Sequence, residues 1–103
     1  MEEKEILDTS VAIEKKEGTI TIFTVIEYPN SVKKSFEIIF PETTDYIKAI
    51  EIAHKLQEKG KPVGAIDMLI AGMCLNRSAQ LLTKDSDFEV ISEIFKEFDV
   101  RFL

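Results

Sequence analysis

The chain has 103 residues, a formal net charge of −6 and a single cysteine, Cys74. That length predicts one domain with one core. The lone cysteine excludes an internal disulfide and a cysteine-based zinc site, and the acidic balance argues against a broad nucleic-acid-binding surface, which is normally basic. No apolar run is long enough to span a membrane and the charged start Met1–Glu5 is unlike a secretory signal, so we expect a cytoplasmic protein.

The first half of the chain predicts short strands joined by short helices. Residues 19–23 alternate and are β-branched, which is typical of a strand. Thr24 and Glu27 follow with the spacing of a capping box, and Pro29 keeps any helix there short because proline lacks the donor N–H. In order, we expect a strand at 6–7, a short helix at 11–13, a charged run at 14–17, a strand at 19–23, a short helix from 24, a polar connection at 30–34 and a strand at 36–40.

The second half predicts longer helices. Residues 45–59 have the clearest amphipathic pattern, and Gly60 ends that helix. Residues 64–75 are apolar on nearly every side, which indicates a helix buried all round. We expect the inner face of the first helix to hold Tyr46, Ala49, Ile50, Ala53 and Leu56, and further expect a strand at 79–83, a helix capped by Ser86 and Glu89 with Phe88, Ile91, Ile94, Phe95 and Phe98 inside, and a strand at 100–102.

Acidic residues recur where these predicted strands end. Strands that alternate with helices are typical of an α/β fold with a mostly parallel sheet, and such sheets bind ligands outside the carboxyl ends of their strands. Asp8 follows the first strand, Glu27 lies just past the second, Asp67 begins the buried helix, and Asp85 lies two residues past the strand ending at Thr83. A set of carboxylates without cysteine or a second histidine selects hard cations such as Mg²⁺ or Mn²⁺. Without the cation, like charges at close range would raise pKa values.

Each acid also has a structural explanation that the sequence leaves open. Asp67 has no basic residue within one helical turn, but free N–H groups and the helix dipole stabilise an anion at a helix start. Asp8 can be a turn residue or helix cap, Glu27 the partner of Thr24 in the capping box, and Asp85 a turn residue.

The order of these segments resembles the signature of PIN-domain ribonucleases, which include the VapC-type toxins of toxin–antitoxin pairs. The resemblance runs almost end to end. It rests on Ile6-Leu7-Asp8-Thr9-Ser10, Thr24-x-x-Glu27, Ile66-Asp67-x-x-Ile70-Ala71 and Leu82-Thr83-x-Asp85-x-Asp87-Phe88.

The resemblance implies a single PIN-like domain over residues 1–103, with a three-layer α/β/α architecture and a small, mostly parallel sheet. It implies a divalent-metal-dependent endoribonuclease, with Mg²⁺ or Mn²⁺ as cofactor. It also implies an RNA substrate, a homodimer, and an antitoxin partner if the chain is a toxin. Asp8, Glu27, Asp67 and Asp85 match the family's catalytic metal-binding acids, Asp87 competes with Asp85 for the fourth place, and Thr9, Ser10 and Lys84 are the candidate substrate-binding residues, with Lys15, Lys16 and Arg77 as further cations.

One departure keeps other hypotheses open. Only residues 28–35 separate Glu27 from the next strand, where family members usually carry a longer helical segment. A folded but catalytically inactive PIN-like interaction module is therefore the alternative. An aspartyl-phosphate enzyme using Asp8 ranks third, because Asp-Thr-Ser lacks a second nearby carboxylate and Lys84 fits the partner lysine only loosely.

Overall fold

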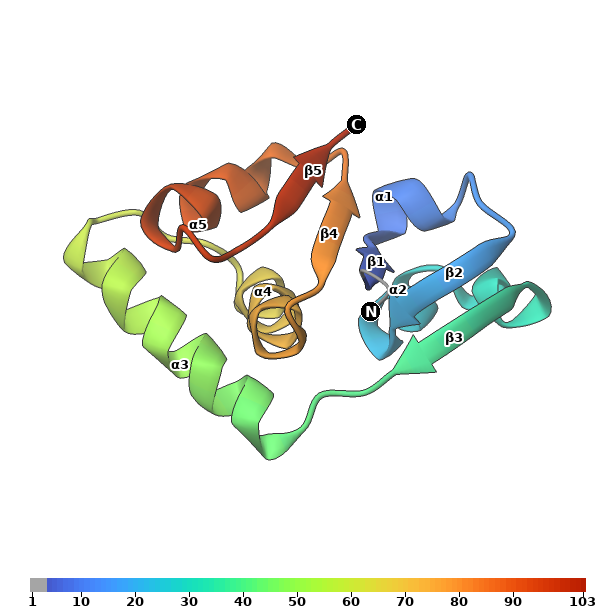
Figure 1. The fold of residues 1–103 in the computed structure, drawn as a ribbon, viewed down its shortest axis with the longest axis horizontal. Helices are drawn as coiled ribbons and strands as arrows, with labels where there is room; N and C mark the ends of the chain where they lie inside the picture. Colours follow the sequence, from blue (N-terminus) through green and yellow to red (C-terminus); the bar gives the residue numbers. More distant parts are fainter. Residues whose placement is uncertain (1–3) are drawn as a thin grey trace.

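The computed structural model describes residues 4–103, and all of its strand pairs are parallel. β1 (Glu5–Leu7) pairs with β4 (Gln80–Thr83), and β4 pairs with β5 (Val100–Phe102). β2 (Glu17–Thr21) pairs with β3 (Ser35–Ile39) in a separate two-stranded sheet. β2 contacts β1, so this pair extends the larger sheet on its β1 side (Figure 1). The predicted α/β class with parallel strands is confirmed, although hydrogen bonding divides the strands into two sheets.

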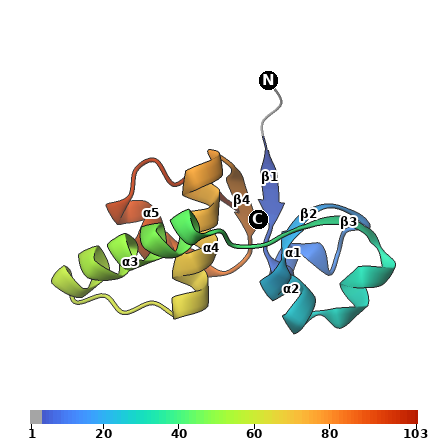
Figure 2. The same cartoon turned by 90° about the horizontal axis from the view of Figure 1, so that it is seen from below.

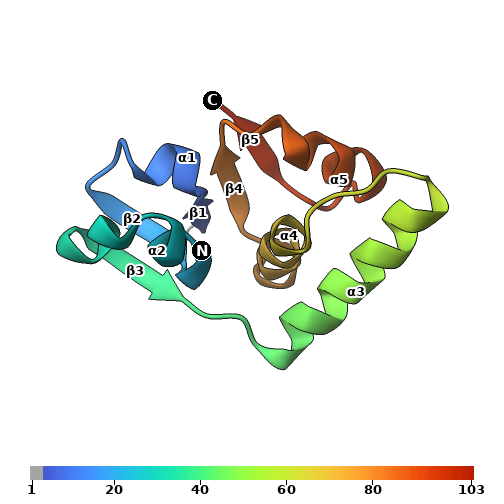
Figure 3. The same ribbon diagram turned by 180° about the vertical axis from the view of Figure 1, so that it is seen from behind.

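The helices gather mainly at one end of the molecule. α3 and α5 lie at that end with α4 beside them, while α2, β2 and β3 lie at the other (Figures 1 and 3). Seen from below, α3 and α4 cross at a steep angle (Figure 2). No helix within residues 4–103 is long and apolar enough to cross a membrane, and Met1–Glu3, part of the charged start considered above, lie outside the described residues. The helices are α1 (Thr9–Ala12), α2 (Ile22–Glu27), the 3-10 helix η1 (Pro29–Lys33), α3 (Thr43–Glu58), α4 (Ala65–Arg77), the 3-10 helix η2 (Ser86–Phe88) and α5 (Glu89–Ile94).

The central strands bury apolar side chains on both faces, which is why helices cover both. Successive residues of a strand point to opposite sides of the sheet. Ile6 of β1 and Leu81 of β4 accordingly pack into a cluster with residues of α3, α4 and α5, whereas Leu7 and Leu82 pack with residues of α1 and β2. This pattern agrees with the expected three layers. Cys74 of α4 is fully buried, as predicted for a small apolar side chain, and burial raises the pKa of its thiol to about 12.

Two predicted helix caps are wrong. β2 starts at Glu17 and ends at Thr21, so α2 begins at Ile22 and Thr24 lies inside the helix. Ser86 and Glu89 do not form the second predicted box either, because Asp85 takes the cap position and its carboxylate accepts from the amide of Asp87. Pro29 acts as predicted: α2 stops before it, and Pro29 starts η1.

The predicted inner face of α3 is wrong in part. Leu56 is buried as predicted, but Tyr46 and Ile50 are 51% and 58% exposed, and the other buried residues of the helix are Asp45 and Ile52. The helix turns its Asp45 side to α4 because the two backbones approach closely at Gly72. A Cβ atom at Gly72 would lie 3.1 Å from the carbonyl oxygen of Asp45. Residues 69–74 of α4 are buried, as predicted for this helix. Its first turn is not, since Ile66 is 46% exposed.

Candidate metal centre

Four of the sequence-predicted acids line one cavity at the ends of β1 and β4. Parallel pairing of these two strands brings their carboxyl ends together, and Asp8 and Asp85 follow there. Asp67 comes from the first turn of α4 and Glu27 from the last residue of α2. The cavity has a volume of about 490 Å³. Its four acids therefore come from four different segments of the chain, as the strand-end argument requires.

Asp87 lies close to two of these acids. One carboxylate oxygen each from Asp67, Asp85 and Asp87 lie within 4.8 Å of one another, and among the described residues neither Asp8 nor Glu27 belongs to this group. Asp87 is exposed and does not line the cavity, whereas Asp67 and Asp85 are half-buried and do. The carboxylates of Asp85 and Asp87 are therefore both close enough to Asp67 to share a cation with it. The sequence left open which of the two is the fourth acid, and in the structure Asp85 is the one that lines the cavity.

Two hydroxyl groups hold the carboxylate of Asp8. Thr83 Oγ1 donates to Asp8 Oδ2 at 2.8 Å and Ser10 Oγ donates to the same oxygen at 3.1 Å. Each hydroxyl also accepts a backbone N–H from the loop after β4: Ser10 from Lys84 and Thr83 from Asp85. Asp8 occupies the N-cap position of α1, but its side chain makes no capping hydrogen bond. The structure therefore ties Asp8 to the loop that carries Asp85.

Glu27 is held by a threonine of the neighbouring helix. Thr9 Oγ1 donates to Glu27 Oε1 at 2.7 Å and lies 3.0 Å from Thr24 Oγ1. Glu27 consequently has a partner on α1 in place of the backbone amide that a capping box would supply.

The cavity is acidic without a compensating basic residue in its wall. Among the described residues, no lysine or arginine lines it. Burial, and then the charges of Asp85, Asp8, Asp87 and Glu27, raise the pKa of Asp67 to about 6. A cation placed among these oxygens would relieve this repulsion, and an all-carboxylate set fits Mg²⁺ or Mn²⁺.

None of the basic residues expected to contact the substrate, Lys15, Lys16, Lys84 and Arg77, lines the cavity. Lys84 Nζ forms an ion pair with Glu14, and the guanidinium of Arg77 is bound by Asp45. Thr9 and Ser10, the other candidate substrate contacts, line the cavity, but their hydroxyls make the hydrogen bonds described above.

Sequence reasoning missed an apolar wall of the same cavity. Its members come from α2 and α4, and two of them are well exposed, Ile26 at 69% and Ile66 at 46%. The signal was their position beside the acids, since Ile26 precedes Glu27 and Ile66 precedes Asp67. The wall is formed by Phe23, Ile26, Ile66 and Ile70.

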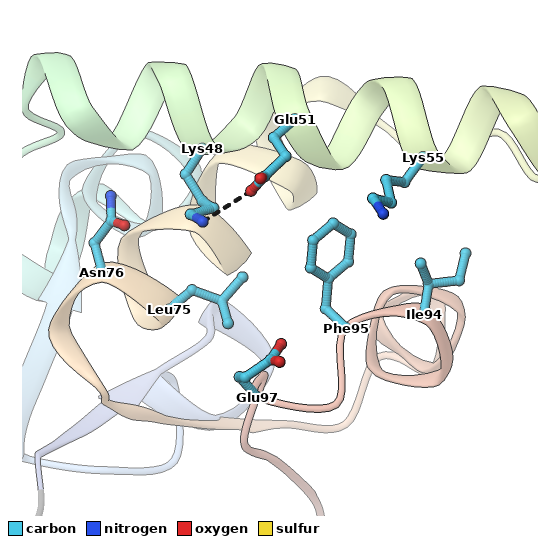
Figure 4. Close-up of a pocket in the computed structure, with 8 residues that line it drawn as sticks. All are labelled: Lys48, Glu51, Lys55, Leu75, Asn76, Ile94, Phe95 and Glu97. Carbon is cyan, nitrogen blue, oxygen red and sulfur yellow. Dashed lines mark hydrogen bonds and ion pairs between the residues drawn. The ribbon is translucent and has the colours of Figure 1, made fainter.

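A second cavity, of about 470 Å³, lies between α3, α4 and the segment around α5. Lys48 and Glu51 form an ion pair on its α3 side, and Leu75, Ile94 and Phe95 provide its apolar surface (Figure 4). None of the predicted site residues lines it. The acidic cavity is therefore the better candidate site.

Comparison with known proteins gives this arrangement a family. The model of the PIN domain matches residues 28–94. The chain belongs to the PIN-domain family. A search of curated proteins found no matching sequence.

Solved structures confirm the PIN-like fold. The chain is similar to DNA-bound VapBC from Salmonella typhimurium, with 22% identity, a TM-score of 0.76 and 98% of each chain covered. It is similar to VapBC2 from Rickettsia felis bound to a promoter DNA fragment, with 18% identity, a TM-score of 0.73 and 95% of this chain and 97% of that one covered. It is also similar to VapBC-5 of the toxin–antitoxin family from Mycobacterium tuberculosis, with 16% identity, a TM-score of 0.78, and 99% and 100% covered.

Proposed function

We propose that this PIN-domain protein is a divalent-metal-dependent ribonuclease that hydrolyses RNA phosphodiester bonds, and that it is the toxin of a toxin–antitoxin pair. The observation that carries the nuclease proposal is the convergence of Asp8, Glu27, Asp67 and Asp85 on one cavity without a basic residue in its described wall. The toxin proposal is supported by the fold, which is similar to that of VapBC toxin–antitoxin structures.

The acids are proposed to hold the ion, and the hydroxyls to hold the acids. Asp8, Glu27, Asp67 and Asp85, which line the cavity, would bind Mg²⁺ or Mn²⁺, and Asp87, which is exposed, lies close to Asp67 and Asp85. When bound, such an ion supplies charge for a non-bridging phosphate oxygen and lowers the pKa of a coordinated water. Ser10 and Thr83 both donate to Oδ2 of Asp8, so Oδ1 is the oxygen that would be available to the ion.

The rest of the cavity suggests how RNA would lie. With a phosphate at the acids, the sugar and base would lie against the apolar wall, where Phe23 would be available to an unpaired base. Stacking on an aromatic side chain is worth about 1–3 kcal/mol per base. Thr9 and Ser10 act on the metal ligands in this proposal, and Lys84 would reach a flanking phosphate only by leaving Glu14.

Cleavage of RNA by the purified protein tests this function. We expect cleavage of a mixed panel of single-stranded and structured RNAs with Mn²⁺, and its loss with EDTA. Asp8→Asn and Asp67→Asn should abolish it, because each removes a ligand, while Glu58→Gln on the exposed end of α3 is the matched control and should cleave like wild type. Cleavage that persists in EDTA, or in both Asn variants, would contradict the proposal.

The inactive interaction module is the alternative, and the short connection between β2 and β3 is the feature that favours it. That connection holds only α2 and η1. Binding of Mn²⁺ without cleavage across the RNA panel would support the module, whereas cleavage would exclude it. Both hypotheses keep the acids and therefore allow Mn²⁺ binding, so only the measurement of RNA cleavage separates them.

A further inference from the structure

The hydrogen bonds around Thr9 have a defined direction. The hydroxyl of Thr9 has one proton, and an ionised carboxylate can only accept. Since Thr9 Oγ1 lies 2.7 Å from Glu27 Oε1, that proton belongs to this bond. The oxygen of Thr9 must then accept from Thr24, whose hydroxyl lies 3.0 Å away. The donors run from Thr24 to Thr9 to Glu27.

Thr24 is the buried end of this chain. Thr24 is only 1% exposed, whereas Glu27, one turn later on α2, is exposed. A threonine inside a helix often donates to a carbonyl one turn back, but the hydroxyl of Thr24 faces α1. An exposed glutamate beside other acids would move toward solvent, so a fixed donor is needed to keep its carboxylate in the cavity.

We propose that Thr24 is a positioning residue that orients Glu27 through Thr9. This inference rests on the proposed function, in which Glu27 is a metal ligand. Thr24 would touch neither the ion nor the RNA. Outer partners of this kind typically change metal affinity by about 10- to 100-fold when they are removed.

Thr21 provides a matched control three residues earlier. It is also 1% exposed, and its hydroxyl has no hydrogen-bond partner within the described part of the chain. Thr21→Val and Thr24→Val thus make the same chemical change at two buried sites, and only the second breaks the chain to Glu27.

Titration of Mn²⁺ into the wild type and variants by calorimetry tests the proposal. We expect Thr24→Val to weaken Mn²⁺ binding by roughly 10-fold, Thr24→Ser to restore it, and Thr21→Val to bind like wild type. If Thr24 acts only through Thr9, adding Thr24→Val to Thr9→Val should weaken binding no further than Thr9→Val alone. Thermal melting in EDTA checks that each variant is folded, and Thr24→Ala replaces Thr24→Val if the latter is not.

The outcomes separate this inference from the function on which it rests. A wild type that binds no Mn²⁺ overturns the proposed function and this inference with it. A wild type that binds Mn²⁺, with Thr24→Val unchanged or Thr21→Val equally weakened, overturns only the positioning role. Additive effects of Thr9→Val and Thr24→Val would likewise contradict it.

Discussion

The carboxylate of Asp67 lies where its own charge is disfavoured. Burial removes water from it, and the charges of Asp85, Asp8, Asp87 and Glu27 add repulsion, so its pKa rises from 3.8 to about 6. The free N–H groups of the first turn of α4 act in the opposite direction, but the net direction of the shift shows that they do not dominate. A simple helix-start anion would have a lowered pKa, so the position of Asp67 agrees better with a binding role.

The sign of this shift gives a pH prediction for Asp67→Asn without metal. The native state holds the Asp67 proton more tightly than the unfolded state, so the contribution of Asp67 to stability falls as the pH rises from about 3.8 through about 6. Asparagine carries no charge, so the variant should match wild type below this range and be the more stable protein above it. Urea unfolding in EDTA at several pH values measures the difference between the two.

Mn²⁺ should reverse the order of the two proteins. Wild type gains about 2.7 kcal/mol when the ion reaches a hundred times its dissociation constant, and Asp67→Asn should lose most of that gain. Equal responses of the two proteins to Mn²⁺ in thermal melts would show that Asp67 belongs to the scaffold and would remove the central ligand of the proposed site.

At the scale of elements, an ion pair between a buried carboxylate and a partly exposed guanidinium fixes α3 against α4. Arg77 Nη1 and Nη2 donate to the two oxygens of Asp45 at 2.9 and 3.0 Å. Asn76 and the backbone amide of Glu42 add further bonds to the same carboxylate. Burial alone would raise the pKa of Asp45, but the bonds from Arg77, Glu42 and Asn76 lower it below its ordinary value.

Breaking this pair should destabilise the fold far more than breaking an exposed one. Arg77→Met leaves Asp45 buried without its countercharge, which costs about 3–5 kcal/mol. Lys48→Met, which breaks the exposed pair with Glu51, is the control and should cost less than about 1 kcal/mol. Because the pKa of Asp45 is lowered on folding, its stabilisation is present above 3.8 and is lost as the pH falls through the folded value. Urea unfolding measures both variants, and equal losses would contradict the role of the pair.

The same pair explains why the sequence predicted the elements better than their orientation. Periodicity located α3 and α4 and most of the strands, because it depends only on neighbours along the chain. The face of α3 depends on Arg77 and Gly72, which are distant in sequence, so the apolar stripe through Tyr46 and Ile50 was the wrong one. In the site, the positions of Asp8 and Asp85 were predictable from the strands that they follow, whereas the proposed role of Thr24 was not, since its spacing to Glu27 equally fits a capping box.

At the scale of the whole molecule, an apolar surface stays uncovered because α3 packs on α4 with its Asp45 side and not with the face that holds Tyr46 and Ile50. Phe40, Tyr46, Ile47 and Ile50 are each more than half exposed. A groove of about 310 Å³ runs between α3 and the start of α4 beside them. Ile66 lines both this groove and the acidic cavity, so the apolar surface continues to the candidate site.

This surface favours the homodimer that the family resemblance implies, and we propose a second copy of the chain as its occupant. Exposed apolar patches larger than a few hundred Å² are uncommon on monomers and mark interaction sites. A second copy of the chain would cover Ile47 and Ile50 with the same residues, as a two-fold interface requires. We expect light scattering to give the mass of a dimer at micromolar concentrations.

Charge placed in the groove should separate the two copies. Ile50→Lys should give a monomer that stays folded, because Ile50 is 58% exposed and leaves no cavity in the core. Ile13→Lys makes the same change at a residue that is 51% exposed, directly follows α1 and does not line this groove, and it should remain a dimer. A monomeric wild type would contradict the proposal directly. A dimer that survives Ile50→Lys but not Ile13→Lys would place the interface near Ile13 instead. The α3–α4 groove would then be the better candidate surface for an antitoxin.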